Sequence, residues 1–264
     1  MDMLLEVAMN GSIFVLKTWI RYTIICGGAF ALFWLLLARP LQHRRCQDKA
    51  PDRSVLWSEF KNSLSGSIFF LIPIISAIPL YHAGHLKVDF NAAPGEPVWM
   101  VVSFILFVIG ADAWFYWVHR VMHDSRIYAW THELHHVSEN PSPLASYSFS
   151  LLEGIGLGLY LPLVLLIFPM NVWVIAAFAL FFALLEAYVH LGYEIAPRGF
   201  ASNPITKWFG TSVFHNMHHE NGAFNFGVYF TFWDRVMGTI HPEYETRFKT
   251  VTRKPLISIF QKSV

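Results

Sequence analysis

Five long apolar runs constrain this chain more than any other feature of its sequence. They cover about Tyr22–Ala38, Gly66–Tyr81, Val98–Val118, Leu152–Phe168 and Val172–Val189. A helix needs about 20 mostly apolar residues to cross roughly 30 Å of hydrocarbon at 1.5 Å per residue. With 55% hydrophobic and 14% charged residues among 264, the chain is too apolar for an ordinary soluble domain. The runs therefore predict an all-α, multi-pass transmembrane protein with four or five spans.

The loops between the runs predict how the chain is oriented. Only Pro169-Met170-Asn171 joins the last two runs, so they should form a helical hairpin whose ends return to one side. The segment between the first two runs is rich in Lys and Arg, which indicates a cytoplasmic loop. Its basic residues are Arg39, Arg44, Arg45, Lys49, Arg53 and Lys61. Lys17 and Arg21, placed just outside the first span, argue weakly for the opposite orientation.

Charge and terminal composition narrow the class of protein further. The formal net charge is +1, so no basic surface indicates nucleic acid, and we expect no nucleic-acid partner. Asp2 and Glu6 stand where a signal peptide carries positive charge, so we expect the first run to remain as a membrane anchor. We expect an integral protein of a bacterial inner membrane or the endoplasmic reticulum.

Nine of the thirteen histidines follow a repeated spacing. HRVMH contains His119 and His123; HELHH contains His132, His135 and His136; HNMHH contains His215, His218 and His219; His190 ends the fifth run. Residues three and four apart share a helix face, with Cβ atoms about 5–6 Å apart, so each motif should direct two or three imidazoles at one point. Counting crossings from the basic loop places all these segments on the cytoplasmic face.

Nine imidazoles exceed the four ligands that a structural zinc accepts, so we expect two metal ions. Imidazole suits iron, copper, nickel and zinc alike, and the spacing does not choose among them. The remaining histidines fall outside the pattern, and we expect them to be hydrogen-bonded core or surface residues without a metal. They are His43, His82, His85 and His241.

One motif has a second interpretation. His132-Glu133-Leu134-His135-His136 also satisfies H-E-x-x-H, in which two histidines bind zinc and the glutamate acts as a general base. This reading predicts an intramembrane zinc metalloprotease, but it leaves HRVMH and HNMHH without a role. One zinc per chain would favour the protease, and a pair of metal ions would favour the two-metal reading.

The motifs together resemble those of the sterol desaturase and fatty acid hydroxylase family of membrane di-iron enzymes. That family carries H-x-x-x-H, H-x-x-H-H and H-x-x-H-H in this order, with a further histidine that His190 matches. The stretch YFTFWDRVMGT, Tyr229–Thr239, is similar to the family's closing segment, and the resemblance covers about Val98–Thr239. It implies two iron ions held by the nine histidines, with O2 as co-substrate.

The resemblance also implies an activity and its partners. The expected reaction is hydroxylation or desaturation of an unactivated C–H bond of a sterol, fatty acyl chain or related lipid. No fused cytochrome b5 domain is recognisable, so electrons should come from a separate donor of the cytochrome b5 or ferredoxin type. Without a visible repeat or linker, we expect a single domain over residues 1–264, with its di-metal catalytic part at about 98–240 and its active site on the cytoplasmic side.

Two carboxylates are candidates for orienting the imidazoles. Asp112 lies seven residues before His119, and Glu186 lies four before His190. Both fall in apolar runs, where a carboxylate is costly unless it faces a polar partner. We expect them to accept imidazole N–H groups, with bonds to a neighbouring helix or water as the alternative. Glu133, Asn216 and Glu220 have a similar position among the histidines, although helix geometry turns Glu133 away.

Several further residues carry weaker expectations. Asp234 and Arg235 either brace the C-terminal segment or form a surface ion pair. Trp114, Phe115, Tyr116 and Trp117 are expected to form an interfacial aromatic belt. Gly154, Gly156 and Gly158 are expected to permit close helix packing. The connector from Pro141 to Glu153 either lines a lipid entrance or is a plain loop.

Overall fold

The computed structural model describes residues 3–90 and 97–256 and is mostly helical. Four of its helical segments are long and apolar enough to cross a membrane: Met3–Leu36, Arg53–His82, Pro97–Met122 and Val172–Val189. A shorter apolar segment, Leu151–Ile167, accompanies them. The prediction of four or five apolar spans is confirmed.

The spanning segments consist of the following elements. The first contains α1 (Met3–Tyr22), α2 (Gly28–Phe30) and two π-helical stretches, η1 (Thr23–Gly27) and η2 (Ala31–Leu36). The second contains α3 (Arg53–Ser76) and α4 (Ile78–His82), and the third is α5 (Pro97–Met122). The fifth apolar run forms α10 (Val172–Val189), while the fourth is divided into α8 (Leu151–Gly158) and α9 (Tyr160–Ile167).

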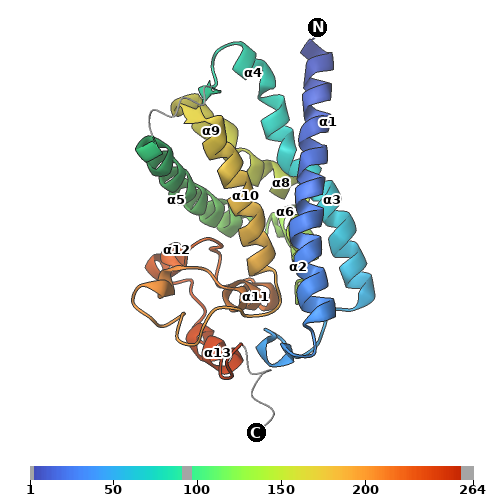
Figure 1. The fold of residues 1–264 in the computed structure, drawn as a ribbon, viewed down its shortest axis with the longest axis vertical. Helices are drawn as coiled ribbons and strands as arrows, with labels where there is room; N and C mark the ends of the chain where they lie inside the picture. The colour runs from blue at the N-terminus through green and yellow to red at the C-terminus, as the bar shows by residue number, and fades with distance from the viewer. Residues whose placement is uncertain (1–2, 91–96, 257–264) are drawn as a thin grey trace.

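The remaining elements are short. They are η3 (Gln42–Arg44), β1 (Val88–Asp89), α6 (Tyr128–Thr131), α7 (Glu133–His136), η4 (Pro143–Ala145), β2 (Met170–Asn171), η5 (Thr206–Trp208), α11 (Ser212–Glu220), α12 (Phe232–Met237) and α13 (Tyr244–Val251). The helices α11, α12 and α13 gather at the end of the molecule opposite to the N-terminus (Figure 1). We call residues 190–256 the cap.

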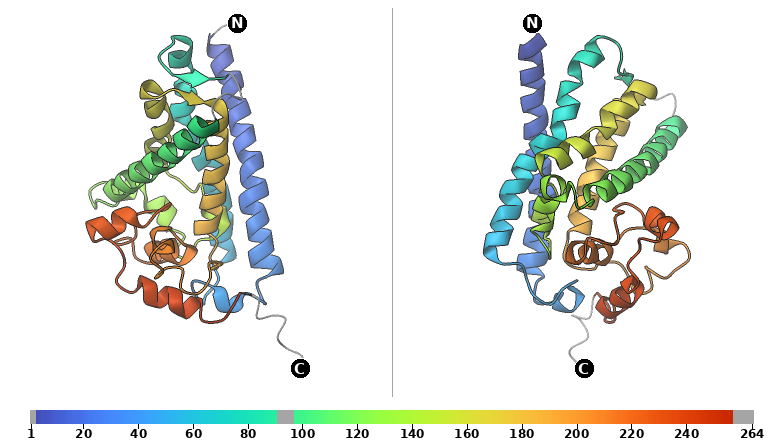
Figure 2. Two further views of the ribbon diagram at one scale, coloured as in Figure 1. Left: turned by 60° about the vertical axis from the view of Figure 1, so that its left-hand side comes forward. Right: turned by 180° about the vertical axis from the view of Figure 1, so that it is seen from behind.

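The long helices run between the two ends of the molecule. Figure 2 shows α1 and α3 side by side along the height of the bundle, with α5 crossing it obliquely. At the end that holds the N-terminus, α9 and α10 form the expected hairpin. Its connector also forms a strand, because β2 pairs in parallel with β1, with Val88 opposite Met170.

The first span begins much earlier than the hydropathy of the sequence predicts. We expected it at about Tyr22–Ala38, with Lys17 and Arg21 outside it, but the helix starts at Met3. Polar residues recur on one face of this first half, at Glu6, Asn10, Lys17 and Arg21, and lower its average hydropathy. All four residues line a cavity in the bundle, with Lys17 exposed and the other three half-buried, so the side of the helix that borders the cavity is polar.

Close packing of α8 against α3 depends on glycine. A Cβ atom on Gly154 would lie 2.7 Å from Cβ of Phe69, and one on Gly158 would overlap the carbonyl oxygen of Phe70. A Cβ on Gly156 would lie 2.8 Å from Cε of Met122. The prediction that these glycines serve helix packing agrees with these contacts.

The four consecutive aromatic residues before HRVMH do not form a belt. Tyr116 is fully buried, and Trp114 donates to the carbonyl oxygen of Gly156 at 3.0 Å. Phe115 packs against His119, whereas Trp117 is 42% exposed. The belt prediction is wrong because successive helical residues point about 100° apart, so four in a row cannot face one lipid interface.

The connector after HELHH is a loop pinned to the first two spans. Glu59 of α3 accepts from both the backbone N–H and the hydroxyl of Ser142, and Tyr22 donates to the carbonyl oxygen of Leu144 at 2.8 Å. Among the described residues, none from 141 to 153 lines the large cavity of the molecule. This contradicts the idea that the connector lines a lipid entrance and favours the plain-loop alternative.

We predict that Gly158→Ala lowers the thermal unfolding midpoint of the detergent-solubilised protein. The added methyl group would press on the Phe70 carbonyl, and overpacking of this kind costs roughly 1–3 kcal/mol. Gly28→Ala is the matched control, since nothing lies within 4 Å of its added Cβ. Equal midpoints for the two variants would contradict the packing argument.

Candidate metal centre

Nine histidines lie in two groups, each with its potential ligand atoms within 4.8 Å of one another. The first group contains His119, His123, His132, His136 and His218, and the second contains His135, His190, His215 and His219. They are the nine residues that the sequence motifs single out. Each group is mostly buried and large enough to hold one metal ion.

Four segments far apart in the sequence supply these side chains. The C-terminal end of α5 carries the HRVMH pair, and His190 follows the last residue of α10. The short α7, with His132 at its N-terminal cap, carries HELHH. In the cap, α11 carries HNMHH, and Thr211 fixes its start by accepting from the backbone N–H of Phe214 at 3.1 Å.

Each H-x-x-H-H motif is shared between the two groups. In HELHH, His132 and His136 belong to the first group and His135 to the second; HNMHH divides the opposite way, with His218 in the first. Each motif thus directs two imidazoles at one group, within the expected two or three, and the third histidine of each H-x-x-H-H motif joins the other group. Residues i and i+4 lie closer in angle than residues i and i+3, which separates the middle histidine from its neighbours.

Backbone carbonyl groups orient two rings of the first group. The Nδ1 atom of His119 lies 2.6 Å from the carbonyl oxygen of Phe226, and that of His218 lies 2.6 Å from the carbonyl oxygen of Phe224. A carbonyl oxygen only accepts, so each Nδ1 carries the hydrogen and each Nε2 presents a lone pair. Both rings are thus held in the tautomer that binds a metal through Nε2.

Glutamates orient two further rings. The Nδ1 atom of His132 lies 2.7 Å from Oε1 of Glu153, and both side chains are buried. The Nδ1 atom of His190 lies 2.9 Å from the carbonyl oxygen of Glu186 and 3.5 Å from its carboxylate. A carboxylate behind an imidazole fixes its orientation and raises its basicity as a ligand.

The Nε2 atoms of each group face one another at short range. The separations are 2.7 Å for His119 and His132, 3.0 Å for His136 and His218, 3.0 Å for His190 and His215, and 3.2 Å for His215 and His219. Nitrogens about 2.1 Å from a shared metal and at right angles would lie about 3.0 Å apart. Where both Nδ1 atoms carry the hydrogen, the facing lone pairs repel unless a cation lies between them. The donor set therefore fits two metal ions.

Burial keeps these rings neutral, as metal binding requires. Desolvation lowers the pKa of His136 to about 4, and desolvation reinforced by neighbouring imidazoles lowers the pKa of His123 to about 2 and that of His190 to about 4. The pKa values of His132, His135, His215, His218 and His219 lie well below 6.5 for the same reason. At neutral pH these imidazoles present lone pairs instead of charges.

Of the two carboxylates proposed from the sequence, one contacts a histidine. Glu186 reaches His190, as described above. Asp112 is buried but accepts from the backbone N–H of Phe230 at 3.0 Å, so it holds a cap segment rather than an imidazole. Asp112 lies seven residues before His119 and therefore on about the same helix face. Its carboxylate is nevertheless hydrogen-bonded to the cap backbone and not to His119.

Two supporting carboxylates, Glu153 and Glu194, were not assigned from the sequence, and a third, Asp234, was expected to brace the C-terminal segment. The signal for Glu153 was Ser150-x-x-Glu153, a capping box that opens α8 and leaves Oε1 free for His132. Glu194 is fully buried and accepts from the backbone N–H of Val213, near the start of α11. Asp234, for which bracing was expected, accepts from the backbone N–H of Phe226, whose carbonyl group orients His119.

The other polar residues near the motifs point away from the rings. Glu133 is exposed, Glu220 pairs with Arg247 at 3.0 Å, and Asn216 donates to Asn140 at 3.0 Å. Arg235 donates to Thr231 at 3.0 Å and forms no recorded ion pair with Asp234 within the described residues. An exposed Glu133 cannot serve as the buried general base that the zinc protease requires.

The histidines outside the motifs also lie outside both groups. His82 contacts Glu6 at 2.9 Å, His43 contacts the carbonyl oxygen of Pro255 at 3.2 Å, and His241 accepts from the backbone N–H of Glu243. None of them belongs to a group of potential metal ligands among the described residues.

An elongated cavity of about 650 Å³ leads from the N-terminal end of the bundle towards the histidines. Its lining is mostly apolar and comes from α1, α3, α5, α8, α9 and α10. Phe115 and Tyr229 line one end, with ring centroids 6.2 Å apart, and the Phe115 ring lies 5.1 Å from that of His119. One layer of aromatic side chains thus separates the cavity from the first histidine group.

Comparison with known proteins gives one matching family model. A model described as fatty acid hydroxylase matches residues 104–239, which are 136 of the 264 residues and include all nine grouped histidines. No solved structure matches the chain significantly.

Several characterised sterol enzymes are similar to the chain. Lathosterol oxidase of Rattus norvegicus is 28% identical over 193 residues, which cover 69% of this chain and 63% of that protein. Methylsterol monooxygenase 1 of Gallus gallus is 26% identical over 238 residues, covering 89% and 77%. Delta(7)-sterol 5(6)-desaturase ERG3A of Gibberella zeae is 30% identical over 157 residues, covering 59% and 43%. The chain spans less than two thirds of the lathosterol oxidase length.

We predict that Glu153→Gln weakens metal binding by about 10- to 100-fold, the usual cost of removing a carboxylate behind a metal-binding histidine. The measurement is metal retained by the purified protein during titration with a chelator. Glu133→Gln is the control, since Glu133 is exposed. An unchanged affinity in Glu153→Gln would contradict the proposed orientation of His132.

We also predict that the metal-free protein loses stability as pH falls from about 7 to about 5. A histidine whose pKa is lowered on folding has no effect on stability well above pH 6.5 and destabilises the fold increasingly below it, because the unfolded chain takes up protons that the buried ring does not. Each such histidine destabilises the fold by up to about 1.4 kcal/mol per pH unit. The measurement is the thermal unfolding midpoint of the metal-free and the metal-loaded protein as a function of pH. We expect the metal-loaded protein to keep its midpoint to a lower pH. A flat profile for the metal-free form would refute it.

Proposed function

The chain belongs to the fatty acid hydroxylase family, and we propose that it is a membrane di-iron enzyme that uses O2 to hydroxylate or desaturate a lipid. The observation that carries this proposal is the convergence of nine neutral imidazoles in two groups beside an apolar cavity. No side chain oxidises an unactivated C–H bond; two bound iron ions would supply that chemistry with O2.

We propose that all nine grouped histidines hold the metals, five on one ion and four on the other. The carbonyl groups of Phe224 and Phe226 and the carboxylate of Glu153 keep the rings of the first group in place. In the second group, the Nδ1 atoms of His135, His215 and His219 have no hydrogen-bond partner among the described residues. Packing alone would therefore orient three of the four rings around the second ion, while Glu186 orients His190.

The cavity supports a lipid substrate. It opens within the membrane-spanning part and ends at Phe115 and Tyr229, which keep water away from the reacting carbon. The relatives are named as oxidising or desaturating sterols, so a sterol, a fatty acyl chain or a related lipid is the proposed class. Hydroxylation needs one C–H bond held beside the metals, and desaturation needs two neighbouring ones.

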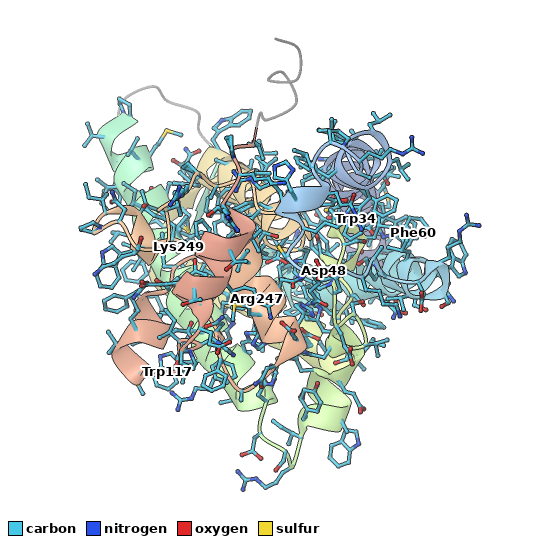
Figure 3. All side chains as sticks on the ribbon, turned by 90° about the horizontal axis from the view of Figure 1, so that it is seen from below. Trp34, Asp48, Phe60, Trp117, Arg247 and Lys249 are labelled. Carbon is cyan, nitrogen blue, oxygen red and sulfur yellow. The ribbon has the colours of Figure 1, made fainter. Side chains whose placement is uncertain are left out.

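We propose that the cap lies on the cytoplasmic side and receives electrons from a separate donor of the cytochrome b5 or ferredoxin type. The basic segment after the first span contacts the cap, since the backbone N–H of Glu194 donates to the carbonyl oxygen of Arg44 at 2.9 Å. Figure 3 views this end from below, with Arg247 and Lys249 on α13. Basic side chains here favour a cytoplasmic location and an acidic electron donor.

We predict that the purified protein binds about two iron ions and that His123→Ala, His135→Ala or His218→Ala abolishes O2-dependent lipid oxidation. Each change removes one imidazole from a group, while membrane insertion should persist. His241→Ala is the matched control, because His241 lies outside both groups. The readouts are metal content and lipid profiles of cells with and without each variant.

Two results would contradict the proposal. One zinc per chain, with proteolytic activity, would favour the metalloprotease reading of HELHH instead. Full oxidation of lipid by His135→Ala or His218→Ala would remove that residue from the set of proposed ligands.

A further inference from the structure

A row of polar side chains on α1 faces the cavity. Glu6, Asn10, Lys17, Thr18 and Arg21 all line it, and their spacing of three, four and seven residues places them on one helix face. The cavity volume of about 650 Å³ lies within the roughly 300–1,000 Å³ that small-molecule sites occupy. The site is thus large enough for a lipid and has a polar wall.

The two ends of this row differ in charge balance. At the N-terminal end, Glu6 pairs with His82 at 2.9 Å. Arg21 lies fifteen residues further along the continuous helix α1, which is about 22 Å at 1.5 Å per residue. Among the described lining residues Glu6 is the acidic one, so no lining carboxylate compensates the cations deeper in the cavity.

Arg21 has few partners of its own. Its recorded hydrogen bond goes to the hydroxyl of Thr18 at a long 3.4 Å, and its Nε is buried without a partner among the described residues. No carboxylate of the described residues forms an ion pair with it. A guanidinium inside a membrane-spanning segment is costly unless something compensates its charge.

A second unpartnered group lies next to Arg21. The hydroxyl of Tyr147 is buried without a hydrogen-bond partner among the described residues. Burial raises the pKa of this phenol, while the nearby guanidinium of Arg21 lowers it in part. The Tyr147 ring packs against Phe70 and Phe182, which both line the cavity, at 6.3 and 5.8 Å. Tyr147 itself does not line the cavity, so it packs behind the aromatic lining and Arg21 is the donor that faces the ligand.

We propose that Arg21, assisted by Lys17, binds the anionic group of the lipid substrate, a carboxylate or a phosphate, whose apolar body fills the rest of the cavity. Arg21 presents several N–H donors in a planar fork that matches the oxygens of both groups. This inference rests on the proposed function, since it names the class of lipid that the enzyme oxidises. It distinguishes this chain from an enzyme for neutral sterols.

The position of Arg21 also places the anionic group near the metals. The Tyr147 ring lies 5.9 Å from that of Phe149, which lies 5.9 Å from that of His135. The polar end of the lipid would then lie at the histidine end of the cavity, and its alkyl end would point towards Glu6 and His82. Oxidation follows near the polar end of the lipid.

The test measures lipid binding to the purified full-length protein in detergent, with and without its metals. The probes are oleate, oleoyl lysophosphatidate, methyl oleate and cholesterol. We expect at least one of the two anionic lipids to bind about tenfold or more tightly than methyl oleate and cholesterol, the scale of a charge-assisted hydrogen bond. The preferred anion identifies the headgroup as carboxylate or phosphate.

Three variants locate the effect. Arg21→Met should weaken oleate binding about tenfold or more and leave methyl oleate binding unchanged, while Arg21→Lys should retain part of the preference. Arg39→Met is the matched control, because Arg39 is exposed and does not line the cavity. Since Arg21 forms no ion pair, Arg21→Met should keep its thermal midpoint and metal content. If Arg21→Met fails to fold, the inference is tested by oleate binding to Lys17→Met and by the comparison of the four lipids on the unmodified protein.

Equal affinities for both anionic lipids, methyl oleate and cholesterol would overturn the inference, as would unchanged binding of the preferred anionic lipid in Arg21→Met. Arg21-dependent binding of oleate by a protein that holds no iron and oxidises no lipid would support this inference while the proposed function fails. The proposed function and the proposed binding of an anionic lipid can therefore be disproved independently of each other.

Discussion

Imidazole lone pairs that face one another across about 3 Å are the constraint on which the rest of this structure depends. Such an arrangement is unfavourable for neutral rings by themselves, and favourable around a cation. Surrounding groups remove the alternative tautomer: carbonyl oxygens of Phe224 and Phe226 and the carboxylate of Glu153 each accept from an Nδ1. The bundle and the cap therefore act as a frame that holds ligands in place before a metal arrives.

The division of each H-x-x-H-H motif between the groups couples the two sites mechanically. His135 belongs to one group while His132 and His136, on the same short helix, belong to the other. A movement of α7 or α11 would displace histidines of both groups together, so these two helices link the geometry of one group to that of the other. Asp112 and Asp234 contribute to this rigidity from outside, by fixing the backbone of Phe230 and Phe226.

The sequence predicts the membrane fold and the meeting of the histidines because both depend on strong local patterns. Hydropathy locates α10 at its observed bounds, and the spacing of the motifs selects the nine residues that the structure brings together. The hydrogen bonds that orient the Nδ1 atoms were not predictable, because every residue has a backbone carbonyl group and the sequence does not show which of them will accept. The contact between Glu153 and His132 was not predicted for a related reason. The sequence around Glu153 indicates only its capping-box role in α8, whereas His132 lies 21 residues away along the chain.

The first span shows where hydropathy misleads. An average over a window treats a helix as uniform, but α1 separates a polar face from an apolar one, and only the latter meets lipid. The charges that made Lys17 and Arg21 look like flanking residues are the ones turned into the cavity. A guanidinium without a carboxylate partner is costly in a medium of low dielectric. An anionic ligand beside Arg21 offsets that cost, so the same electrostatics favours a negatively charged lipid in the cavity.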